Sequence, residues 1–266
     1  MMWLRAARAV GIISLASVVV APKSRTERSA GLTFDYSTAA TTQPAGPNGA
    51  GAFSMTGRGI ATSAGSTRID VIATEGVSLY KVGDYLVVIN GKTSLVHPDT
   101  KTYVDLDAQA NNIVKNMPPA LLAQMTITNI TGAAEKVSGD EQLDGRSTEH
   151  HRTNLGYAMN VMGTAIPSTV VMDIWLAKLP FKIALPVSGG SKKPEPGPMA
   201  EMMQKQYDII PRPEGFTLIK SSTGTTSSIM GQTVGSNIVA EMKNIKEGDV
   251  DASRFVVPSD FAKADK

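Results

Sequence analysis

The sequence contains no cysteine, and aromatic residues make up only 5% of its 266 residues. The absence of cysteine excludes disulfides, thiolate catalysis, cysteine-based zinc sites and a lipid anchor on an N-terminal cysteine. The fold must therefore be held by an apolar core alone. A hydrophobic content of 42% in a chain of this length is sufficient for such a core.

The sequence also has little net charge, because 26 Lys and Arg residues face 24 Asp and Glu residues. Five of the basic residues and one of the acidic residues fall within the first 30 positions, so the remainder carries 21 against 23. Nucleic-acid binding depends on clustered basic residues. A nearly neutral chain without a basic stripe therefore argues against a nucleic-acid partner.

Motifs that carry enzyme chemistry are also absent: no His-Glu-x-x-His, Gly-x-Ser-x-Gly, P-loop or dinucleotide-binding glycine pattern occurs. Ser78 and Lys81 match Ser-x-x-Lys, but that motif requires a helical turn and this stretch is predicted to be extended. His150 and His151 are adjacent on a predicted strand, so their side chains point to opposite faces and do not share a metal ion. We expect no catalytic residues, no metal and no cofactor.

An apolar run over Val10–Ala21 follows Arg5 and Arg8 near the N-terminus. The run is too short to span a membrane and is typical of a signal-peptide core. We interpret residues 1–30 as a signal peptide and disordered N-terminal segment, which predicts a periplasmic or secreted protein. A retained N-terminal anchor helix is the alternative.

The stretch Leu79–Leu106 predicts a tight antiparallel meander. Gly83-Asp84, Asn90-Gly91 and Pro98-Asp99 are typical turn pairs, and Asn-Gly tolerates the positive φ angles of a type I′ hairpin. Between the first two turns, Tyr85–Ile89 is rich in β-branched and aromatic residues. We therefore predict three short strands joined by three turns.

The rest of the chain predicts more strands, interrupted twice by helical patterns. The strands are expected over 32–41, 52–64, 66–74, 127–136, 146–157, 169–176, 216–222, 225–233 and 238–245, and the helices over 108–125 and 199–209. About 10–11 antiparallel strands must curl to protect their edges. We predict a mainly β fold, an incomplete antiparallel β-barrel or half-barrel with helical lid insertions. One domain covers 31–260, with a flexible Pro-rich insertion at 186–198 and a tail at 261–266.

Several short motifs resemble those of a known family. The run Gly83–Gly91 followed by His97–Tyr103 is similar to hairpins of bacterial envelope proteins with the lipoprotein-carrier (LolA-like) fold, including uncharacterised exported relatives. Gly139–His151, which leads to Trp175, and Asp251–Pro258 resemble further parts of that family. The resemblance covers about residues 31 to 260. It implies an incomplete antiparallel barrel around an apolar cavity closed by helices, in which the best-known members shelter lipid or lipoprotein acyl chains in the periplasm.

A cavity of this kind would need apolar walls. Three of the 13 methionines lie on the predicted helix behind the Pro-rich insertion, where they suit contact with an irregular apolar ligand or simply dock the helix onto the sheet. The expected cavity residues are Ile69, Val71, Tyr85, Val87, Ile89, Met199, Met202 and Met203. The other face of the meander, with Leu86 and Val88, is equally apolar, so its orientation stays open.

These observations lead to two hypotheses. The first is a non-enzymatic, exported envelope protein that binds a hydrophobic ligand, a lipid or an acylated protein, in a half-barrel cavity, with peripheral membrane contact possible. The second is an envelope scaffold or protein-interaction module with a closed cavity, whose protein partner binds an edge strand or the loop at 188–198. An enzyme with a dispersed site is a third, less favoured interpretation.

Overall fold

The computed structural model describes residues 28–44, 51–76, 78–108, 118, 120, 124–137, 141–185 and 199–264. The signal-peptide run, most of the helical pattern at 108–125 and the insertion at 186–198 lie outside the described residues. The strands are β1 (Arg28–Gln43), β2 (Phe53–Thr62), β3 (Thr67–Gly76), β4 (Tyr85–Ile89), β5 (Lys92–His97), β6 (Thr102–Asp105), β7 (Met125–Lys136), β8 (Glu141–Leu143), β9 (Arg146–Val161), β10 (Thr164–Lys178), β11 (Phe216–Ile229), β12 (Gln232–Asp251) and β13 (Ala262–Lys263). Helix α3 spans Ala200–Ile209, and a 3₁₀ turn, η2, spans Ala252–Arg254.

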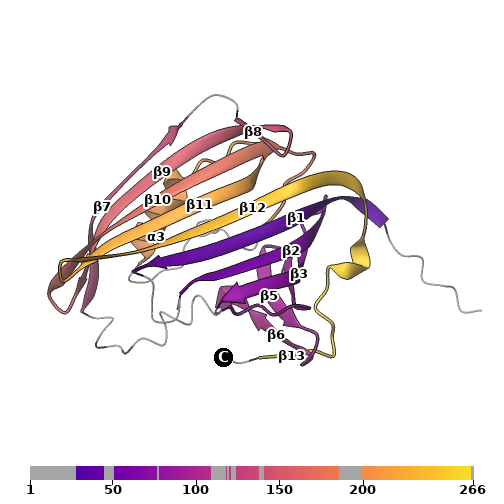
Figure 1. Cartoon of the computed structure of the whole chain (residues 1–266), viewed down its shortest axis with the longest axis horizontal. Coiled ribbons are helices and arrows are strands. Elements are labelled where there is room, and N and C mark those ends of the chain that lie inside the picture. The colour runs from indigo at the N-terminus through magenta and orange to yellow at the C-terminus, as the bar shows by residue number, and fades with distance from the viewer. Residues whose placement is uncertain are drawn as a thin grey trace, which may run out of the picture.

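All thirteen strands belong to one open sheet (Figure 1). The strand order is β13-β6-β5-β4-β3-β2-β1-β12-β11-β10-β9-β7, and β8 pairs separately with β9. Neighbouring strands are antiparallel except β13 and β6. The sheet does not close on itself, which confirms the predicted mainly β, half-barrel class. Two of its strands, β8 and β13, are too short to be recognised from residue pattern. Conversely, β11 runs without a break through 216–222 and the first part of 225–233, which were predicted as separate strands.

The two ends of the domain meet in the middle of this sheet. β1 pairs with β12 from Arg28 opposite Asp251 to Gln43 opposite Gly235. Arg28, Ser29 and Ala30, which we had assigned to the N-terminal segment, are therefore part of β1. The predicted tail also contributes, because β13 pairs with β6.

The predicted meander is present as β4, β5 and β6, joined in consecutive antiparallel pairs. Asn90 and Gly91 have φ angles of 51° and 72°, as a type I′ turn requires. Ahead of β4, the backbone N–H of Lys81 donates to the buried Asp84 carboxylate at 2.8 Å. The local turn chemistry thus determines where these short strands begin and end.

The largest apolar cluster lies on the face of the sheet that carries Leu32, Phe34 and Tyr36 of β1, here termed the core face. Side chains from β2, β3, β4, β5, β11 and β12 join it, and the segment after β10 packs against it through Leu179 and Ile183. Two smaller clusters flank it. The core is therefore assembled mainly around β1 to β5, at one end of the long strands.

Candidate ligand groove

A row of oppositely charged residues crosses the long strands at matching positions, and is here termed the ionic belt. Residues that pair across neighbouring strands share a face. The paired positions are Glu135 with Arg152, Arg152 with Asp173, Lys220 with Glu241, Lys243 with Asp35, Asp35 with Arg58, and Arg58 with Asp70. Because Asp35 lies between Phe34 and Tyr36 in β1, the belt runs across the face opposite to the core face.

Beyond the ionic belt the strands carry no charge. The segments 36–57, 153–172 and 221–240 contain no Asp, Glu, Lys, Arg or His. The described parts of these segments include the ends of β1, β9, β10, β11 and β12 that lie beyond the belt (Figure 1). From Asp173 in the belt to Thr164 at the start of β10, this uncharged half is roughly 30 Å long at the usual rise per strand residue. The strands of this half supply no charge that could attract or orient a ligand.

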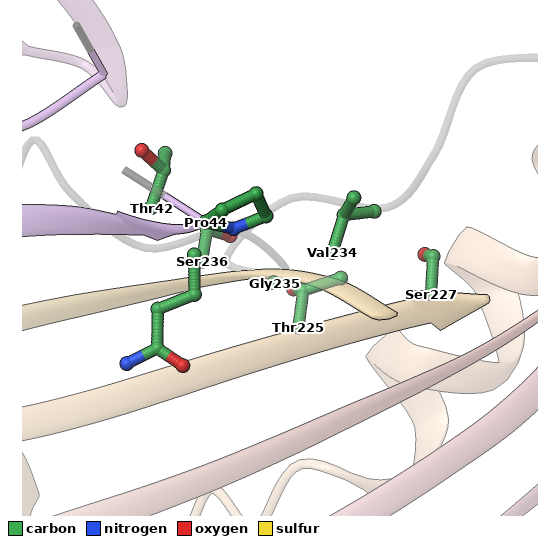
Figure 2. A pocket seen from close by; sticks show the side chains of 8 residues that line it. Thr42, Pro44, Thr225, Ser227, Val234, Gly235 and Ser236 are labelled. Carbon is green, nitrogen blue, oxygen red and sulfur yellow. The ribbon is translucent and has the colours of Figure 1, made fainter. Parts of the chain in front are cut away.

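A shallow pocket lies on the core face of the uncharged half (Figure 2). Its volume is about 410 Å³, within the range of small-molecule sites. It is lined by the end of β1 and by β11 and β12: Thr42, Gln43, Pro44, Thr225, Ser227, Val234, Gly235 and Ser236. Its walls are uncharged, with hydroxyl groups beside apolar carbon, so the groove suits a ligand without formal charge.

The inner side of this pocket continues into the main core along β1. Thr38 and Ala40 lie on the same face between Tyr36 and Thr42, and both are buried. The hydroxyl groups of Tyr36 and Thr38 are buried, and neither makes a hydrogen bond of standard geometry. Burial raises the pKa of the Tyr36 phenol above its usual value, and the nearby Tyr80 adds to that effect. The Thr38 hydroxyl lies close enough to lower this pKa slightly, but the Tyr36 hydroxyl stays neutral. Two buried, neutral hydroxyl groups thus lie along β1 between the pocket residue Thr42 and the rest of the main core.

Helix α3 lies on the same face as the pocket. Its Ile209 approaches Gly132 of β7, which pairs with Leu155 of β9. Leu155 pairs with Val170, and Val170 pairs with Thr225 in the pocket wall. The helix therefore covers the β7–β9 side of the core face, while the pocket occupies the β11–β12–β1 side.

The predicted cavity residues do not share one surface. Ile69 and Val71 belong to the main core, whereas Tyr85 and Val87 form a second cluster on the other face, with Ile89 at its border. The reason is the register of β3 and β4. Ile69 pairs with Leu86 and therefore shares its face, so Tyr85 and Val87, on either side of Leu86, point to the opposite face. The second cluster is covered by Val257 and Phe261 from the C-terminal segment.

The three methionines lie at α3. Met199 precedes the first residue of the helix, Met202 is buried, and Met203 is 44% exposed. Among the predicted cavity residues, these three methionines belong to a helix that lies beside the pocket on the same face of the sheet. The pocket itself was missed from sequence, although the long uncharged segments were a readable signal for it.

A polar cluster around His150 was also missed. Its Nδ1 lies 3.1 Å from Glu141 Oε1 and its Nε2 lies 2.9 Å from Asp173 Oδ1. The ring stacks on Trp175 with centroids 4.3 Å apart, and the Trp175 Nε1–H donates to Glu141. Arg152 donates two hydrogen bonds to Asp173. Because these groups satisfy one another, the cluster fixes β8 against β9 and β10 at the ionic belt.

Among the described residues, no helix is long and apolar enough to cross a membrane. No family model and no curated protein matches the sequence.

Several solved structures resemble the fold. A LolA superfamily protein from Nitrosomonas europaea covers 85% of this chain and 90% of its own length, at 5% identity and a TM-score of 0.31. A putative outer membrane lipoprotein-sorting protein domain from Vibrio parahaemolyticus covers 85% and 89%, at 6% identity and a TM-score of 0.28. LprF from Mycobacterium bovis covers 86% and 90%, at 11% identity and a TM-score of 0.24. The first of these structures is of a member of the family that the sequence motifs resemble.

Proposed function

We propose that this chain is a non-enzymatic, exported envelope protein that binds a hydrophobic ligand, a lipid or an acyl chain, on the core face of its uncharged half. The observation that carries the proposal is the pocket of about 410 Å³ in a region without charged residues. Transfer of an alkyl chain from water to such a site is favourable, whereas a charged ligand would lose hydration without gaining an oppositely charged partner from the pocket walls.

In this proposal the polar end of the ligand reaches along β1 from the pocket to the hydroxyl groups of Tyr36 and Thr38. An ester or amide carbonyl can accept a hydrogen bond from either hydroxyl. A lipid tail with such a group at its head would place the carbonyl at the inner end of the groove and its chain along β11 and β12. The adaptable methionine side chains of α3 flank the same face.

The experiment is mass spectrometry of organic extracts from natively purified protein, comparing wild type with Thr225→Glu. Thr225 lines the pocket, so a carboxylate there is expected to deplete a bound lipid. Thr226→Glu is the matched control, because the next residue on the same strand points to the other face and is exposed. A stoichiometric lipid in wild type and Thr226→Glu but not in Thr225→Glu supports the proposal. No lipid in wild type, or equal lipid in all three, would contradict it.

The second candidate is an envelope scaffold or protein-interaction module. The observation that favours it is strand β7, which is an edge of the sheet and, among the described residues, pairs with β9 alone. Edge strands offer unpaired backbone groups to another chain. A soluble envelope protein retained in a pull-down, and lost when residues 189–198 are deleted or when β7 receives a proline, would favour this function over ligand binding.

A further inference from the structure

Two hairpins of the uncharged half end in the same dipeptide. β9 turns into β10 at Met162-Gly163, and β11 turns into β12 at Met230-Gly231. Both turns have two residues with positive φ, 52° and 80° in the first and 49° and 79° in the second. The pairing of Ser168 with Ser227 places both tips at the same end of the sheet, where the long strands converge in Figure 1.

Methionine is not the residue that these turns favour. A type I′ turn prefers Asn or Asp followed by Gly, because a short polar side chain tolerates the left-handed conformation. This chain follows that preference at Asn90-Gly91 and at Asp144-Gly145. At the two tips the local preference is broken in the same way twice. Departures of this kind are expected where a side chain serves function rather than folding.

Both methionine side chains are directed into solvent. Met230 is 92% exposed and Met162 is 71% exposed, and Ile229 beside Met230 is 40% exposed. The tips are turns at the far end of the uncharged half, and within the described part of the chain no wall surrounds these side chains. A rigid partner would need a matching cavity for each one, whereas the interfacial layer of a bilayer surrounds a projecting apolar side chain without one.

We propose that Met162 and Met230 form a membrane-contact edge, which inserts between lipid headgroups and holds the uncharged end of the sheet against a bilayer. The absence of basic residues from the segments that end in these tips excludes an electrostatic attraction to anionic lipid through them. Binding through the tips is therefore apolar in origin, insensitive to salt and the same for zwitterionic and anionic surfaces. This contact involves other residues than the groove, so it stands or fails independently of the proposed function.

The test is flotation with phosphatidylcholine vesicles, comparing wild type with Met162→Asn/Met230→Asn. Asparagine suits the turn conformation, as Asn90 demonstrates, so the double variant is expected to fold as wild type does. The protein is purified after export and its N-terminus is established by mass spectrometry, so that both proteins begin at the same residue. We expect about tenfold weaker vesicle binding in the double variant, with no change on adding phosphatidylserine or salt. Val256→Asn, which alters an exposed apolar residue of the C-terminal segment, is the matched control and should bind as wild type.

A second measurement reports on the two side chains directly. Peroxide oxidation is followed by peptide mass spectrometry with and without vesicles, and Met162 and Met230 should be protected by the lipid. Met55, buried in the main core, is the internal reference, and vesicles should leave its oxidation unchanged. Met203 flanks the face of the groove, so protection of Met203 would report lipid in the groove and not contact at the tips.

Equal vesicle binding by wild type and the double variant would overturn the proposal, as would oxidation of Met162 and Met230 that vesicles leave unchanged. No wild-type binding, or binding that requires anionic lipid, would do the same. If wild type is instead dimeric without vesicles and the double variant monomeric, the tips are a contact between copies of this chain, and the membrane proposal fails.

Discussion

The Tyr36 hydroxyl allows a contribution to protein stability to be distinguished from a contribution to ligand binding. It is buried in the main core, yet its hydroxyl makes no hydrogen bond of standard geometry. An unsatisfied buried hydroxyl lowers stability rather than raising it. We therefore expect Tyr36→Phe to leave the free energy of unfolding unchanged or to raise it by up to about 1 kcal/mol, measured by urea denaturation of lipid-free protein.

Tyr85→Phe is the control for that measurement. The Tyr85 hydroxyl donates to the Val256 carbonyl at 3.2 Å, so its removal should lower stability by about 1 kcal/mol. If Tyr36→Phe lost more stability than Tyr85→Phe, the Tyr36 hydroxyl would have to be satisfied within the protein. If Tyr36→Phe kept its stability but retained less lipid, the hydroxyl would serve the ligand.

Asp173 gives a prediction about pH. Its partial burial acts to raise the pKa of the carboxyl, but the hydrogen bonds from Arg152 and His150 outweigh this and hold the pKa below its usual value. A carboxyl with a lowered pKa in the folded state stabilises the fold above its unfolded pKa of about 4, and this contribution is lost as the pH falls through the folded pKa.

Asp173→Asn should therefore lower the free energy of unfolding by about 1–3 kcal/mol at neutral pH. The gap to wild type should narrow as the pH falls below about 4. Urea unfolding at a series of pH values measures this directly. A gap that stayed constant across the whole range would show that the loss comes from packing rather than from the charge.

Among the elements, α3 depends on a glycine for its position. A Cβ at Gly132 would lie 3.0 Å from Ile209 Cδ1 and 3.3 Å from Lys205 Cε, both on the helix. Gly132→Val should push α3 away from β7 and lower stability by about 1–3 kcal/mol. Hydrogen exchange of residues 200–209 should speed up. Gly224→Val is the comparison, because a Cβ there meets only the Val171 carbonyl at 3.9 Å, and it should leave exchange in α3 unchanged.

Some turns between the elements could be predicted from the sequence and others could not. The meander was predictable because its turns carry Asn90-Gly91 and a capping Asp84, which act locally. The Met162-Gly163 and Met230-Gly231 turns were not, because methionine does not signal a turn. As a result 225–233 was predicted to be one strand, although the chain turns at Met230.

The candidate site was predictable only in part, for a related reason. The alternation of side chains along one strand shows which residues share a face of that strand. It does not show which face of the neighbouring strand lies on the same side of the sheet. Ile69 and Tyr85 were expected on one wall, but the connection between β3 and β4 sets a register that pairs Ile69 with Leu86. A shift of one residue exchanges all side chains between faces. The ionic belt likewise exists only once the strands are aligned.

For the whole molecule, the ionic belt divides the sheet into halves of different stability. Most of the large, fully buried side chains belong to β1–β5 on the core side, whereas the hairpin ends beyond the belt bury few. Local opening is easiest where few apolar contacts hold the backbone. In lipid-free protein, amide exchange should be slowest in β2–β5 and fastest in the β9–β10 and β11–β12 hairpin ends, measured by mass spectrometry.

The same division separates the two proposed functions. A ligand in the groove adds apolar contacts along β11 and β12, so returning lipid should slow exchange in 221–240 while β4 and β5 stay unchanged. Thr226→Glu should respond as wild type does, and Thr225→Glu should not respond. A scaffold whose interior is closed by its own side chains would exchange at the same rate with and without lipid. It would instead be protected in β7 by its protein partner, so one exchange experiment with each additive distinguishes a lipid carrier from a scaffold.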